Sequence, residues 1–398
     1  MMNLIRTLCY TACLLLSCSS IAAELSAHVD KSINKAFWLE QEGDATGAIE
    51  LLNALNPHRK YDRAYIDRML GILYWQTEKP ELAQQALTNA VSSDVLPADL
   101  QAKTRRMLAD ILLVNGKYDN AILHYQYLID HIPQGVDGDG KRNSLLSELW
   151  MRVAQANYQA EHWQPVLQAV DQYQTYQPAL QAPQLTLRLG AQLSLSKWAG
   201  AITTVSSLKQ LEPAKARWWQ QQTGLYLQQK QYGNALANIK QYQRAGFKLT
   251  QPEYRTMAKL YASQKAPELA AKIYHDAITD KQTQDWMTEA RYWTQARQWD
   301  LAIDAWRVTS EQDDQYKKQY VQVLLQQKMY RQALAVVSSI PQPSQGYMLA
   351  RVEAHYHLAD FTNAKEAAKQ AFEMQPNEQA KQWLAYLEQR EKRLGQQI

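Results

Sequence analysis

Leu70-Gly71-x-x-Tyr74, followed by Ala83, Leu87 and Ala90, is the stretch that decides the fold of this chain. The first three residues are spaced so that they share one face of a helix, and the last three share one face of a second helix. Ala83 is small, because the second helix must approach the first closely at that point. The stretch therefore predicts a pair of packed helices.

The same spacing recurs along the chain. We call the counterparts of Ala83 the anchor residues: Ala48, Ala83, Ala121, Val166, Ala201, Ala235, Ala270, Ala302, Ala333 and Ala364. They are 31 to 45 residues apart, mostly near 34, and a helix-pair repeat of about 34 residues is typical of tetratricopeptide repeats. The chain resembles that superfamily throughout, so we expect an all-α solenoid of about ten tetratricopeptide-type helix pairs.

Two regions depart from the repeat. Residues 132–143 hold Pro133 and three glycines, which predict a loop inserted between the third and fourth pairs. Asp137 and Glu148 have the spacing of calcium ligands, but Lys141 takes a ligand position, so a solvated loop is expected. After Pro376, residues 377–398 predict a capping helix with a charged outer face, which the end of a solenoid requires.

The first 23 residues have the order of a secretory signal peptide, with Arg6, an apolar run of about ten residues and then small residues up to Ala23. We expect export to the periplasm and the division 1–23 signal peptide, 24–376 solenoid and 377–398 cap. A second interpretation stays open. Leu15-Leu16-Ser17-Cys18 resembles a bacterial lipobox, in which Cys18 would carry a lipid anchor.

Composition and motifs point away from catalysis. The only cysteines are Cys9, Cys13 and Cys18, so the expected mature chain has no thiol nucleophile and no cysteine-bound zinc. Compact catalytic and nucleotide-binding motifs are absent from the sequence. A formal net charge of +4 without a basic block gives no reason to expect nucleic-acid binding. We therefore expect no enzymatic activity, no catalytic residue, no metal and no cofactor.

Partner binding is expected in the groove that the first helices of such pairs line. Inward positions carry six cations that would suit an acidic or carboxylate-ended segment: Arg68, Arg106, Arg255, Lys259, Arg291 and Lys318. Asp110 and Glu353 are the acidic exceptions. A chain with 43 basic residues also places some there by chance. Most tryptophans fall on packing positions, whereas Trp75 and Trp218 lie off that pattern and are the better binding candidates.

A narrower resemblance rests on three stretches: Tyr61 to Arg68, Arg217-Trp218-Trp219 leading to Leu227, and Ala245-Gly246-Phe247 followed by Arg255 to Tyr261. They resemble the periplasmic repeat proteins found with TonB–ExbB–ExbD energy-transducing systems of marine Gram-negative bacteria. That resemblance implies a non-enzymatic protein that assists energised uptake of iron-siderophore or haem and binds TonB-type components. Two alternatives remain: a scaffold for outer-membrane or envelope assembly, which lipidation of Cys18 would favour, and the helical arm of a cell-wall lytic enzyme.

Overall fold

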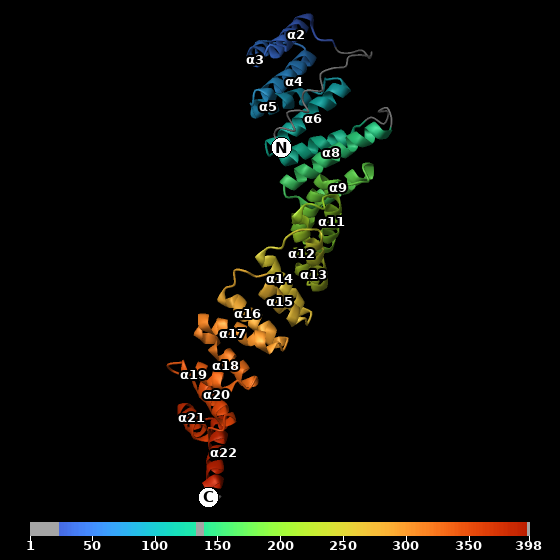
Figure 1. Ribbon diagram of the computed structural model, residues 1–398. Coiled ribbons are helices and arrows are strands. Elements are labelled where there is room, and N and C mark those ends of the chain that lie inside the picture. Colours follow the sequence, from blue (N-terminus) through green and yellow to red (C-terminus); the bar gives the residue numbers. More distant parts are fainter. Residues whose placement is uncertain (1–23, 133–138, 396–398) are drawn as a thin grey trace. The chain divides into compact units, whose positions relative to one another are not determined.

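The structure, a computed structural model, describes residues 24–132 and 139–395. These ranges contain 21 α-helices, the short 3-10 helix η1 (Asp314–Tyr316) and no strand. The helices form ten successive pairs followed by one last helix, α22 (Glu378–Gly395) (Figure 1). The predicted all-α solenoid of helix pairs with a C-terminal capping helix is confirmed.

The chain divides into two compact units, residues 1–213 and 214–398. In unit 1 the pairs are α2 (Ala27–Gln41) and α3 (Ala45–Asn53), α4 (Lys60–Gln76) and α5 (Pro80–Ser92), α6 (Ala98–Val114) and α7 (Tyr118–Asp130), α8 (Asp139–Gln159) and α9 (Trp163–Tyr176), α10 (Ala182–Ser194) and α11 (Trp198–Leu211). In unit 2 they are α12 (Ala216–Gln228) and α13 (Tyr232–Arg244), α14 (Gln251–Ser263) and α15 (Pro267–Asp276), α16 (Thr283–Gln295) and α17 (Trp299–Gln312), α18 (Lys317–Gln326) and α19 (Tyr330–Ser338), α20 (Gln345–His357) and α21 (Phe361–Met374).

The anchor residues occupy one register. Each of the ten is the fourth residue of its second helix, and each is at most 1% exposed. Gly71 shows how closely α4 and α5 approach: a Cβ added to it would lie 2.5 Å from Cγ of Leu87 and 3.4 Å from the carbonyl oxygen of Ala83. These two helices therefore touch at a residue that has no side chain.

The turn inside each pair is equally regular. The residue five positions before each anchor has a positive φ, and it is a glycine only at Gly43 and Gly116. The other eight turn positions are Glu78, Glu161, Ser196, Lys230, Lys265, Arg297, Lys328 and Ala359. At Ala359 the backbone bonds are those of a helix end closed by a left-handed residue, since N–H of Asp360 donates to the carbonyl of His355 at 2.9 Å.

The predicted loop at 132–143 is partly wrong. Residues 139–143 already belong to α8, which is 21 residues long, so part of the long interval between anchors is extra helix. Asp137 lies outside the described residues, and Glu148 pairs with an arginine of this chain, as shown below.

The last helix closes unit 2. Ala380 and Leu387 of α22 are buried, and Leu387 lies in one cluster with Ala364, Ala367 and Ala368 of α21. The predicted signal segment, residues 1–23, lies outside the described residues. Of the helices in the described ranges, none combines the length and the apolar character needed to cross a bilayer.

Candidate protein-binding surface

The predicted site residues differ in exposure. Lys259 of α14, Arg291 of α16 and Lys318 of α18 are exposed, whereas Arg68, Trp75, Arg106 and Arg255 are half-buried. Trp218 is only 5% exposed, so the expectation that it lies off the buried pattern is wrong. The guanidinium of Arg217 lies 4.0 Å from its ring centre, and Trp75 packs against the core of unit 1. A covered ring such as Trp218 offers a partner little surface.

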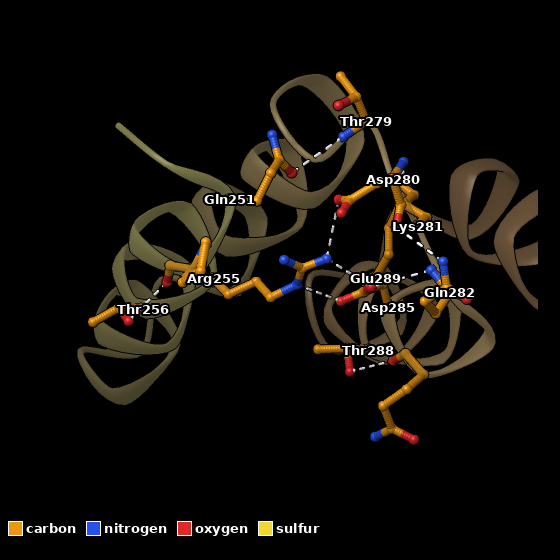
Figure 2. A network of polar contacts seen from close by, with 12 residues as sticks. Gln251, Arg255, Thr256, Thr279, Asp280, Lys281, Gln282, Asp285, Thr288 and Glu289 are labelled. Atoms are coloured by element: carbon orange, nitrogen blue, oxygen red, sulfur yellow. Dashed lines mark hydrogen bonds and ion pairs between the residues drawn. The ribbon is translucent and has the colours of Figure 1, made fainter. Parts of the chain in front are cut away.

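Arg255 is held by the next helix pair (Figure 2). Its Nε donates to Oδ1 of Asp285 at 2.8 Å and its Nη2 donates to Oδ2 at 2.9 Å, which is a bidentate pair. The same Nη2 reaches Asp280 at 3.2 Å, in the loop that precedes α16. Arg255 therefore links α14 to the start of α16, and its charge is already balanced within the chain.

Asp285 has two tasks at the start of α16. It forms a capping box, because its Oδ2 accepts from the backbone N–H of Gln282 at 3.1 Å. The hydrogen bonds from Arg255 are the main reason that the pKa of Asp285 is lowered, and the backbone N–H of Gln282 adds to this against the opposing effect of burial. The carboxylate is thus ionised at neutral pH and fixed from two sides.

Unit 1 has a similar arrangement between α6 and α8. Arg106 forms a two-pronged ion pair with Glu148, its second prong at 3.2 Å. Four residues further along each helix, Arg152 lies 3.7 Å from Asp110. The hydroxyl of Tyr125 also donates to Asp110 at 2.6 Å, and burial, followed by the nearby Asp110, raises the pKa of Tyr125. Arg106 and Asp110, both on inward positions of α6, thus contact Glu148 and Arg152 of α8.

These contacts share a register. Arg106, Gln220 and Arg255 each stand fifteen residues before an anchor, and their acceptors Glu148, Glu253 and Asp285 stand seventeen or eighteen residues before the next anchor. The Gln220–Glu253 bond is 3.0 Å, and Glu253 closes the capping box of α14. We call this set the first-helix ladder. Repeat analysis missed it because each rung joins residues thirty or more positions apart. For Glu253 and Asp285, an acid at the third residue of the following first helix was a usable signal.

Glu289 is a buried carboxylate that sequence reasoning also missed. It is 1% exposed in α16 and lies 2.8 Å from Nζ of Lys281 and 2.9 Å from Nδ1 of His275. Nε1 of Trp293 donates to it at 3.2 Å, while Lys281 lies 4.2 Å from the ring centre of Trp286. The neutralising lysine makes this burial tolerable and fixes the α15–α16 loop. Within the described ranges no cluster of three or more His, Cys, Asp or Glu side chains could hold a metal ion.

Three predicted cations remain open to a partner. Lys259 and Arg291 both stand eleven residues before an anchor, on successive first helices of unit 2, and Lys318 is on the next one. In the described part of the chain, no carboxylate lies within the 4.0 Å ion-pair distance of any of the three. Nη1 of Arg291 lies 4.0 Å from the sulfur of Met287. We call these three side chains the open cation row.

Comparisons with known proteins return only distant structural similarity. No protein-family model and no curated protein matches the sequence. A solved tetratricopeptide repeat protein from Parabacteroides merdae is 15% identical, with a TM-score of 0.37 over 67% of this chain and 99% of its own. The tetratricopeptide repeat domain of P58(IPK) is 13% identical, with a TM-score of 0.25 over 92% of this chain and 99% of its own.

Proposed function

We propose that this chain is a non-catalytic, protein-binding scaffold, and that the open cation row of unit 2 receives an acidic or carboxylate-ended segment of its partner. A solenoid of helix pairs presents long, regular surfaces of the kind that bind extended segments. Lys259, Arg291 and Lys318 give such a surface positive charge on three successive first helices.

The proposal rests on a difference between cations of the first helices in unit 2: some are paired with carboxylates of the chain and others are not. Arg255 stands on the same helix as Lys259, yet two carboxylates of the chain neutralise it. Lys259, Arg291 and Lys318 are exposed and have no such carboxylate among the described residues. These exposed cations form no ion pair within the described residues. A carboxylate of a partner can therefore bind them without first breaking an ion pair of the chain.

The cellular setting belongs to the same proposal. The order of basic, apolar and small residues in positions 1–23 supports export to the periplasm. The resemblance of residues 61–68, 217–227 and 245–261 to TonB-associated repeat proteins supports a role in energised uptake of iron-siderophore or haem. The partner would then be a TonB-type energy-transducing component, and the chain would meet a membrane through that partner or through a lipid on Cys18.

Charge reversal tests the binding surface. The triple variant Lys259→Glu, Arg291→Glu, Lys318→Glu should bind the periplasmic part of the TonB-type transducer at least tenfold more weakly, with unchanged helical content by circular dichroism. A matched control reverses three exposed cations elsewhere in unit 2: Lys230→Glu, Lys240→Glu, Arg331→Glu. Because the net charge changes equally, only a loss confined to the first variant supports the row. Equal loss in both would leave a general charge effect and refute the site.

Growth tests the system. A deletion strain should grow normally on free iron and poorly when iron arrives only as a siderophore or haem complex. The triple variant should behave like the deletion, and the control variant like the wild type. Normal growth of the deletion on siderophore iron and on haem would contradict the TonB assignment without touching the binding measurement.

A further inference from the structure

Trp38 occupies a position that is covered elsewhere in the solenoid. It lies ten residues before the anchor Ala48 in α2, the first helix that the structure describes. Figure 1 labels this helix. Eight other pairs follow a pair of their own unit, and seven of them bury the equivalent residue to 5% exposure or less: Leu73, Ile111, Ala156, Ala191, Leu260, Val323 and Ala354. The eighth, Tyr292, is half-buried. Trp38 is 66% exposed.

The repeats show what normally covers this position. Leu73 of α4 lies in one core cluster with Ala48, Ile49 and Leu52 of α3. Ile111 of α6 lies in one cluster with Ala83 and Leu87 of α5. The second helix of the preceding pair therefore contributes to the cover, since α3 packs on α4 and α5 packs on α6. Among the described residues only 24–26 precede α2, so no helix of that part of the chain takes this place.

Two lysines extend the uncovered face. Lys31 and Lys35 precede Trp38 by seven and three residues, so the three side chains share one side of α2. The equivalent pairs in the next three first helices are buried: Ile66 and Leu70, Thr104 and Leu108, Leu149 and Val153. Lys31 and Lys35 are exposed, and no carboxylate of the described residues lies within 4.0 Å of either. We call Lys31, Lys35 and Trp38 the α2 face.

We propose that the α2 face binds an amphipathic, acidic helix of a partner protein, seated where a preceding second helix would lie. The shape follows from the repeats, which cover this position with a helix. The acidity follows from charge complementarity, since a helix with carboxylates four residues apart would meet Lys31 and Lys35 while its apolar side covers Trp38. The α2 face lies in unit 1 and is independent of the open cation row in unit 2.

The chain supplies a suitable probe. Helix α17 is a second helix, and its sequence has three acids, Asp300, Asp304 and Glu311, against one Arg307, which gives a net charge of −2. A stapled, fluorescently labelled peptide of residues 299–312 should bind the full chain, measured by anisotropy. A control peptide with the three acids changed to the amides should bind at least tenfold more weakly, and added salt should weaken the acidic peptide most.

Variants locate the binding. Trp38→Ser and the double variant Lys31→Glu, Lys35→Glu should each weaken the acidic peptide at least tenfold, whereas Trp38→Phe should stay within threefold of wild type. The double variant Lys79→Glu, Lys117→Glu, which changes two exposed lysines elsewhere in unit 1, should match wild type. Circular dichroism should show the same helix content throughout, because every altered side chain is exposed.

Two outcomes would overturn the proposal. The first is equal binding of the acidic peptide by wild type and Trp38→Ser, or no binding at about 1 mM. The second is self-association: if sedimentation without peptide shows a wild-type dimer and a Trp38→Ser monomer, a second copy of this chain covers the α2 face.

Discussion

At the scale of single residues, backbone strain recurs in the turn inside each pair. Eight of the ten turn positions hold a residue with a Cβ at positive φ, a conformation that costs about 1 kcal/mol relative to glycine. Ala359, at φ 61°, is exposed, so replacing it by glycine removes only a solvent-exposed methyl group. We expect Ala359→Gly to raise the free energy of unfolding of unit 2 by about 0.5–1 kcal/mol in urea titration.

Gly43→Ala is the reverse control. A Cβ at this position meets no atom within 4 Å, but the alanine must adopt a φ of 87°. It should destabilise unit 1, and a stabilising effect would contradict the argument.

The bidentate Arg255–Asp285 pair joins α14 to α16, so we expect it to stabilise the fold of unit 2. Arg255→Met should lower the free energy of unfolding of unit 2 by about 1–2 kcal/mol. Arg291→Met should change it by less than about 0.5 kcal/mol, because Arg291 is exposed and no carboxylate of the described residues forms an ion pair with it. The pKa of Asp285 is lowered in the folded chain, so its contribution is present above the unfolded value of about 3.9 and is lost as the pH falls through the folded value.

Measured against pH, the difference between wild type and Arg255→Met should therefore stay constant from about pH 5 to 8 and shrink below about pH 4. Chemical denaturation at each pH measures it. A difference that grows toward acid would show that Asp285 is not the group stabilised by Arg255.

At the scale of helices, sequence spacing predicts which segments pair, because close approach favours a small residue at one point of the second helix, and nine of the ten anchors are alanine. All ten anchors were found in this way. The repeat pattern does not predict the first-helix ladder, because each rung joins residues of two successive repeats, whereas the pattern describes positions within one repeat. For the same reason the sequence alone predicts that Arg255 and Arg106 bind a partner. Their positions on the first helices were right, but nothing within one repeat shows that Asp285 or Glu148 of the next is within reach.

The capping helix α22 gives the prediction for this scale. In addition to the buried Leu387, α22 places the ring of Trp383 5.2 Å from the ring of Tyr356, measured between centres. The guanidinium of its Arg390 lies 4.0 Å from the ring centre of Phe361. Truncation after Asn377 exposes the alanine face of α21, and we expect a loss of about 2–3 kcal/mol in the last pair. Hydrogen exchange should accelerate most in α20 and α21 and much less in α12. Lys365→Gln, which removes only the exposed ion pair to Glu391, is the control and should have little effect. Unchanged exchange after truncation would deny α22 its capping role.

At the scale of the whole molecule, the repeat spacing does not predict the division at residues 213 and 214, because the anchors Ala201 and Ala235 are an ordinary 34 residues apart. Each unit nevertheless has its own clusters of buried side chains, among them one that runs from Ala83 to Ala191 in unit 1 and one from Ala271 to Val337 in unit 2. In a solenoid each pair is stabilised by its neighbours, so damage should spread locally. Unfolding should then depart from a single two-state transition.

Two matched overpacking variants test this division. Ala83 and Ala270 are both 0% exposed at equivalent anchor positions, one in each unit. A leucine at either site forces the two helices of its pair apart and should cost about 1–3 kcal/mol. If the units unfold separately, Ala83→Leu should shift the thermal transition of unit 1 and Ala270→Leu that of unit 2, as followed by hydrogen exchange of peptides from each unit. Leu269→Ala, at the neighbouring exposed position, should leave both transitions in place. A single transition that both variants shift equally would show that the two units unfold as one cooperative body.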